Sequence, residues 1–72
     1  MNQALSKVVV SLANEKHIEK LLGLADKFGA TQIVNYEGAG KKPVFEFSIK
    51  AAQQKLFTAA IIDEFNDNAE LL

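Results

Sequence analysis

The chain has 72 residues, 49% of them hydrophobic and 24% charged, and a formal net charge of −1. This length allows one domain, spanning residues 1–72, and no apolar run approaches the roughly 20 residues that a membrane-spanning helix needs. The absence of Cys excludes disulfides and thiolate metal sites. Because the first residues do not follow the pattern of a secretory signal, we expect a cytoplasmic protein without membrane contact.

The first element expected in chain order is a strand at residues 7–13, where Val8, Val9 and Val10 form a β-branched run. Residues 1–6 are expected to form an N-terminal tail. An amphipathic helix should follow, because Asn14 is a favourable N-cap and Gly29 a favourable end signal. The apolar residues between them recur at helical spacing: Ile18, Leu21, Leu22, Ala25 and Phe28.

Two strands, at residues 31–37 and 44–49, are expected to form a hairpin around a loop at residues 38–43. If the strands pair about the centre of this loop, three pairs share the face turned towards the helices: Tyr36 with Phe45, Val34 with Phe47, and Gln32 with Ile49. The opposite face would then carry no aromatic residue. This argues against an RNA-binding sheet, which stacks bases on exposed aromatic rings.

A second helix is expected from residue 51 to residue 65, with one apolar arc made by Phe57, Ile61, Ile62 and Phe65. Residues 66–72 should form an acidic tail or a vestigial strand. This order predicts an α+β fold, a two-layer ferredoxin-like plait. It would have the order β-α-β-β-α, a short or missing fourth strand, and both helices on one face of an antiparallel sheet. The third strand would lie between the first and second, which leaves the first strand at the edge.

Apolar residues without a place in this core indicate an interaction surface. A flat edge of three valines is prone to pair with another strand, and apolar residues that share an exposed face are typical of binding patches. The residues expected to bind a partner are Val8, Val9, Val10, Ile33, Val44, Leu24 and Leu56. We therefore expect a small interaction or regulatory module, such as an inhibitor or adaptor, that binds a protein partner and forms a homodimer. The composition would suit an accessory protein of a phage or mobile element.

The lysines suggest an alternative function. Eight lysines and five acids lie at or before Lys55, and four acids follow without a cation. Five lysines could contact phosphates: Lys16, Lys20, Lys27, Lys41 and Lys42. A lysine-mediated, non-specific nucleic-acid-binding protein is thus the alternative. The absence of Arg removes the bidentate contacts that specific recognition uses.

Catalysis has little chemistry to draw on in this sequence. The single His17 has no second His or Cys that could complete a metal site, and no motif pairs carboxylates for acid–base work. We expect no enzyme, no catalytic or metal-binding residues, and no cofactor.

Overall fold

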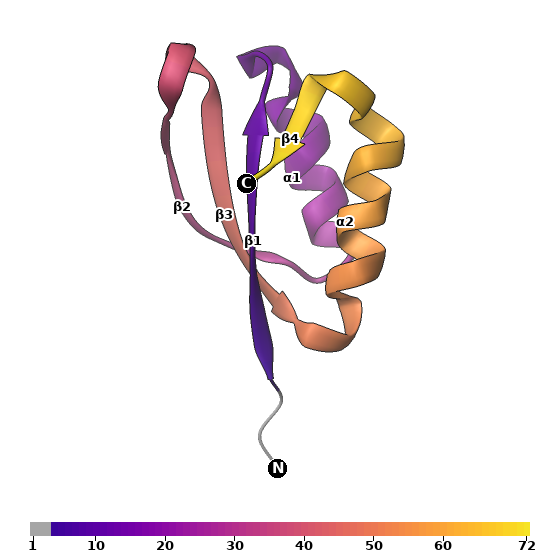
Figure 1. Cartoon of the computed structure of the whole chain (residues 1–72). Helices are drawn as coiled ribbons and strands as arrows, with labels where there is room; N and C mark the ends of the chain where they lie inside the picture. Colours follow the sequence, from indigo (N-terminus) through magenta and orange to yellow (C-terminus); the bar gives the residue numbers. More distant parts are fainter. Residues whose placement is uncertain (1–3) are drawn as a thin grey trace.

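The computed structural model describes residues 4–72 as an α+β fold with two α-helices and a four-stranded antiparallel sheet. The elements are β1 (Leu5–Leu12), α1 (Ile18–Lys27), β2 (Thr31–Glu37), β3 (Pro43–Lys50), α2 (Ala51–Phe65) and β4 (Ala69–Leu71). Short 3-10 turns occupy Glu15–His17, Ala39–Lys41 and Asn66–Asn68. The strand order is β2-β3-β1-β4, so the third strand lies between the first and second, as expected (Figure 1).

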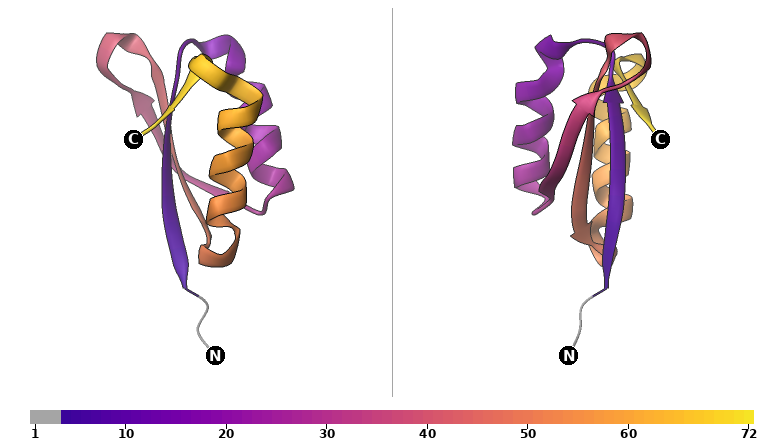
Figure 2. Two further views of the ribbon diagram at one scale, coloured as in Figure 1. Left: turned by 45° about the vertical axis from the view of Figure 1, so that its right-hand side comes forward. Right: turned by 90° about the vertical axis from the view of Figure 1, so that its left-hand side faces the viewer.

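Both helices lie on the same side of the sheet, and the core fills the space between the two layers (Figures 1 and 2). The sheet contributes the inward residues Val8, Val10, Leu12, Phe45, Phe47 and Ile49, and the helices contribute Leu21, Ala25, Phe57, Ile61 and Phe65. The rings of Phe47 and Phe57 meet edge to face, with centroids 5.6 Å apart. This contact joins the central strand β3 to α2.

The start and end signals of the first helix are confirmed. The Asn14 side-chain oxygen accepts a hydrogen bond from the Lys16 amide at 3.0 Å, which opens the 3-10 turn that leads into α1. At the other end Gly29 adopts a left-handed φ of 74° and donates its amide to the Asp26 carbonyl at 3.1 Å. Glycine adopts this conformation without the steric cost that a side chain brings.

The second helix has the expected bounds, but one residue of its apolar arc was misplaced. Phe57, Ile61 and Phe65 are buried, as expected, whereas Ile62 is 58% exposed. Only the i, i+4 row of α2 faces the sheet, and Ile62 is one position away from it.

The N-terminal tail was predicted to be too long, at residues 1–6. Strand β1 begins at Leu5, which pairs with Lys50, and the Ala51 amide donates to the Ala4 carbonyl at 3.0 Å. The ladder reaches this far because β3 continues to Lys50. Residues 1–3 of the expected tail lie outside the described residues.

The expectation that β1 is an edge strand is wrong for its C-terminal half. The short strand β4 pairs with Val10–Leu12, and the Leu72 amide donates to the Val9 carbonyl at 2.9 Å. The fourth strand is therefore present and short. Within residues 4–72, no strand pairs with this edge of β1 at residues 5–8, beyond the end of β4.

The expected pairing of the hairpin is wrong by one residue. In the structure Tyr36 lies opposite Val44 and Asn35 lies opposite Phe45, and a bulge near Ile33 shifts the register further. The cause is the loop, which closes with the Gly38 amide on the Lys42 carbonyl at 2.8 Å. Because hairpin register follows turn geometry, Tyr36 faces away from the helices.

Gly38 lies closer to its neighbours than any side chain would allow. A Cβ atom there would be 2.7 Å from Cγ2 of the buried Val44, whose β-branched side chain has little freedom to turn away. We expect Gly38→Ala to lower the free energy of unfolding by about 1–3 kcal/mol, as other overpacked sites do.

A matched control is Gly23→Ala in α1, where a Cβ atom would have nothing within 4 Å. This change should raise the free energy of unfolding by about 1 kcal/mol, since Ala is the better helix former. Urea unfolding followed by circular dichroism measures both. An unchanged midpoint for Gly38→Ala would contradict the close contact.

Candidate functional site

The sheet face turned away from the helices, called the outer face here, carries most of the exposed apolar side chains of the strands. Val34 is 40% exposed and Tyr36 is 48% exposed on β2, while Val9 is half-buried on β1, on the other side of β3. Leu72 continues from β4 next to Val9 and is 67% exposed. We call Val9, Val34, Tyr36 and Leu72 the outer patch. Among residues 4–72 both helices lie on the other side of the sheet, so neither covers it (Figure 2).

Charges of both signs lie within and around the outer patch. Glu46 lies on β3 between Val9 and Val34, and its carboxylate contacts the Lys7 ammonium at 3.3 Å. Such a solvent-exposed ion pair contributes little to stability. It does neutralise the one acidic group at the centre of the outer patch. The face therefore carries apolar side chains on either side of one central ion pair.

The structure separates the seven residues expected to bind a partner. Val8 and Val10 are core residues, Val44 is buried on the outer face, and Leu24 is half-buried against the core. Val8, Val10 and Val44 therefore offer no side-chain surface. Ile33, at the bulge of β2, and Leu56, on α2, are exposed, and Val9 and Leu24 are each half-buried.

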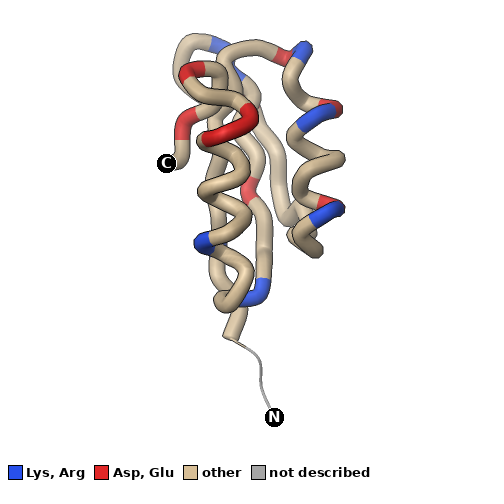
Figure 3. Tube along the Cα trace, turned by 90° about the vertical axis from the view of Figure 1, so that its right-hand side faces the viewer, with Lys and Arg blue, Asp and Glu red and all other residues tan. Residues whose placement is uncertain are grey.

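The five lysines expected to contact phosphates do not form one basic surface. Figure 3 shows acidic and basic positions interleaved along α1. Lys20 contacts the Glu64 carboxylate at 3.3 Å, and its ammonium lies 5.4 Å from the Phe65 ring centroid. The remaining four are all exposed, two on or near α1 (Lys16, Lys27) and two at the hairpin tip (Lys41, Lys42).

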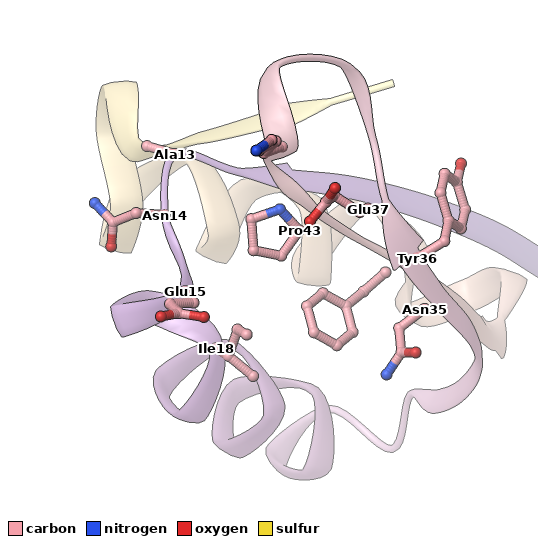
Figure 4. Close-up of a pocket in the computed structure, with 10 residues that line it drawn as sticks. Ala13, Asn14, Glu15, Ile18, Asn35, Tyr36, Glu37 and Pro43 are labelled. Carbon is pink, nitrogen blue, oxygen red and sulfur yellow. The ribbon is translucent and has the colours of Figure 1, made fainter.

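A groove of about 580 Å³ lies between the start of α1 and the end of β2. Its apolar lining includes Ile18, Pro43 and Phe45, and Figure 4 shows Ile18 on α1 and Pro43 across the groove from it. We call it the α1–β2 groove. It results from the register of the hairpin, because the inward positions of β2 hold polar side chains that do not fill the space beneath α1.

Polar groups line both walls of the α1–β2 groove. Figure 4 shows Asn35 and Glu37 pointing from β2 towards it, while the Tyr36 ring points away. Glu15 lies on the opposite wall, at the 3-10 turn before α1, and Lys41 lies at the end formed by the hairpin loop. The lining of the groove thus contains two carboxylates and one ammonium. A bound cation or hydrogen-bond donor would find acceptors on both sides.

His17 and Tyr36 are the residues whose placement sequence reasoning missed. The His17 ring packs edge-on against the Phe65 ring at 6.1 Å, and its Nε2 atom is buried without a hydrogen-bond partner. The position of His17 in the helical pattern did not predict its contact with Phe65. For Tyr36 the sequence shows the loop glycines but not the turn, formed with Lys41, that sets the register.

Within the described part of the chain, no group of three or more His, Cys, Asp or Glu side chains could hold a metal ion. Nor does any helix described for residues 4–72 have the length and apolar character needed to cross a membrane. Comparison with known proteins gives no relative: no family model, no curated protein and no solved structure matches this chain.

Proposed function

We propose that this chain is a non-enzymatic protein-interaction module that associates with a second copy of itself through the outer patch. We also assign it to the ferredoxin-like plaits. The central position of β3 and the two helices on one side of the sheet support that assignment. A regulatory role, as an adaptor or inhibitor, is the functional class that such a module would serve.

The exposure of Val34 and Tyr36 is the observation that carries this proposal. In the alternative register both side chains would pack beneath the helices, where a buried side chain of this size contributes about 1.5–3 kcal/mol. The hairpin loop instead places them on the outer face, which also carries Val9 and Leu72 on the other side of β3. An apolar cluster that a fold leaves in solvent is typical of an interface, and tyrosine is enriched there.

The charges on the outer face favour a second copy as the partner. The face carries Lys7 and Lys50 together with Glu46 and Glu70, so it has no single sign to offer a strongly charged partner. A two-fold interface brings the same surface together with itself. A face with both signs can then pair each lysine with a carboxylate of the other copy.

Sedimentation velocity over a series of protein concentrations tests self-association. The informative variant is Val34→Lys, which places a charge in the outer patch. Val34 lies opposite Glu46, so the new lysine can form a favourable cross-strand pair with this carboxylate. The matched control is Leu56→Lys, at an exposed position on α2.

We expect the sedimentation coefficient of the wild type and of Leu56→Lys to rise with concentration. Val34→Lys should remain monomeric at every concentration. A wild type that stays monomeric throughout would overturn the proposed dimer, as would a Val34→Lys protein that associates like the wild type.

A lysine-mediated nucleic-acid binder is the second candidate, and the outward Tyr36 favours it because an exposed ring can stack on a base. Two observations weigh against it. Tyr36 lies on the edge strand β2, and on the central strands Glu46 occupies the middle of the face. Fluorescence anisotropy with a labelled single-stranded oligonucleotide decides between the two candidates. Binding that weakens steeply with salt and is lost in Tyr36→Ala would support nucleic acid.

A further inference from the structure

We propose that the α1–β2 groove binds an extended peptide segment with basic side chains, which adds as a strand to the free edge of β2. This site lies along the edge of β2 and on its helix side, whereas the outer patch lies on the opposite face of the sheet. Peptide binding there does not require self-association. Three features carry the inference: the open edge of β2, the groove beside it, and the carboxylates on both walls of that groove.

Strand β2 is at the end of the sheet and pairs on one side only in the described chain. All seven of its residues are exposed. Because the Gly38 amide bonds to the Lys42 carbonyl of the facing strand and direction alternates along a strand, the amide and carbonyl groups of Asn35 and Glu37 point away from β3. They are free to pair with another extended chain.

The bulge near Ile33 limits where such a chain can pair. Bulges interrupt the regular ladder and turn the edge, so strand addition would be confined to the regular stretch between Val34 and Glu37. The α1–β2 groove lies beside this same stretch. A short segment of about four residues therefore matches both the edge and the groove.

The groove has the size and lining of a side-chain binding site. Its volume of about 580 Å³ is within the usual range for ligand sites, which combine an apolar floor with a few polar groups. A strand added to β2 would send alternate side chains towards α1. The aliphatic stem of an arginine or lysine could then lie on Ile18 and Pro43, with its charged end near the rim.

Charge determines which side chains fit. Glu15 and Glu37 approach the groove from opposite walls, and Lys41 at the hairpin end is the cation nearest to them among the lining residues. Acidic side chains on the peptide would face these carboxylates at close range. Basic side chains would be attracted from both sides, so the site selects a basic segment.

The probe is a blocked pentapeptide with the sequence threonine-arginine-threonine-arginine-threonine, which keeps apolar contacts with the outer patch small. Binding is followed by amide chemical shifts of the isotopically labelled full chain. We expect the shifts to concentrate at Asn35 and Glu37 and to saturate with peptide. A matched peptide with glutamates in place of the arginines should not bind.

Backbone pairing has its own signature. Only alternate amides of an added strand face β2. N-methylation of the two arginine amides and N-methylation of the threonine amides should therefore have different effects on peptide binding. We expect one of these peptides to lose binding and the other to keep it. Equal binding by both would overturn strand addition, as would equal binding by the glutamate peptide or an absence of shifts at Asn35 and Glu37.

Variants of the chain test the charge argument. Glu15→Gln and Glu37→Gln should each weaken peptide binding about two- to fivefold, the range expected for exposed ion pairs. The matched control, Glu19→Gln, changes a carboxylate on α1 that does not line the groove, and it should bind as the wild type does. Leu72→Lys, which places a charge in the outer patch at the opposite edge of the sheet from β2, should also bind normally. A failure of self-association and a failure of peptide binding at the α1–β2 groove can thus be distinguished.

Discussion

Replacing Phe47 with alanine is expected to lower the free energy of unfolding by about 3–5 kcal/mol, the usual cost of emptying a buried Phe site. Phe47 is fully buried on the central strand β3. Its ring stacks against Phe45 at 6.3 Å and meets Phe57 edge to face at 5.6 Å. Because its partners lie on both the sheet and α2, they cannot close the cavity by moving together. Domains of this length have a total stability of about 4–11 kcal/mol, so the loss is a large share.

Urea unfolding followed by far-ultraviolet circular dichroism measures this loss from the shift in midpoint at an unchanged slope. The control is Ile62→Ala, a similar truncation on α2 where the side chain is mostly exposed. It should change the free energy of unfolding by less than about 1 kcal/mol. Equal losses in the two variants would contradict the central place of Phe47 in the core.

The helices and the central strands could be predicted because their signals are local. The i, i+3, i+4 spacing from Ile18 to Phe28 defines α1, and the Asn14 and Gly29 signals act within a few residues of each helix end. In β3 the alternation of Phe45 and Phe47 with polar residues indicates the buried face, and the structure buries both rings. In each case the residues that determine the element lie inside it.

Alternation could not predict which side chains of β2 turn towards the helices. The residues of β2 form two alternating sets, and either set could face them. Val34 and Tyr36 are the apolar set, and alternation alone therefore turns them inward. The loop decides otherwise. Gly40 and Lys41 both adopt left-handed φ angles, of 71° and 60°, and the resulting turn pairs Glu37 with Pro43. The sequence shows the glycine but not the turn that follows from it.

Both candidate sites depend on the register of the hairpin. The outer patch and the α1–β2 groove both result from the same one-residue shift, which exposes Tyr36 on one face and directs Asn35 and Glu37 to the other. A prediction that misses the shift fills the groove with a tyrosine ring and removes the aromatic residue from the outer face. Both surfaces could therefore be located only once the register was known.

Removing residues 69–72 is expected to destabilise the fold and to create a new contact between copies of the chain. Strand β4 covers the edge of β1 from Val10 to Leu12, and Ala69 and Leu71 pack against the core. Without them the pairing with Val10–Leu12, the hydrogen bond from the Leu72 amide to the Val9 carbonyl and two half-buried side chains are lost. We expect this loss to cost about 2–4 kcal/mol. The exposed edge of β1 would then be a flat, β-branched strand open to pairing.

Sedimentation velocity and urea unfolding of the shortened chain measure the two effects separately. The control is Leu71→Ala, which removes the apolar contact but keeps β4 as a strand. It should lose stability without gaining association. Placing the truncation in the Val34→Lys background removes the outer patch, so the remaining association must come from the β1 edge.

A truncated chain as stable as the full one would show that β4 contributes little to the sheet. Unchanged association in the Val34→Lys background would show that the edge of β1 is protected without β4. Lys7 is the residue that would give such protection, because it lies on the part of β1 that β4 does not cover, and two copies paired about it would oppose like charges. In the part of the chain that the structure describes, that stretch of the edge is open. A charged residue there disfavours strand pairing where β4 does not reach.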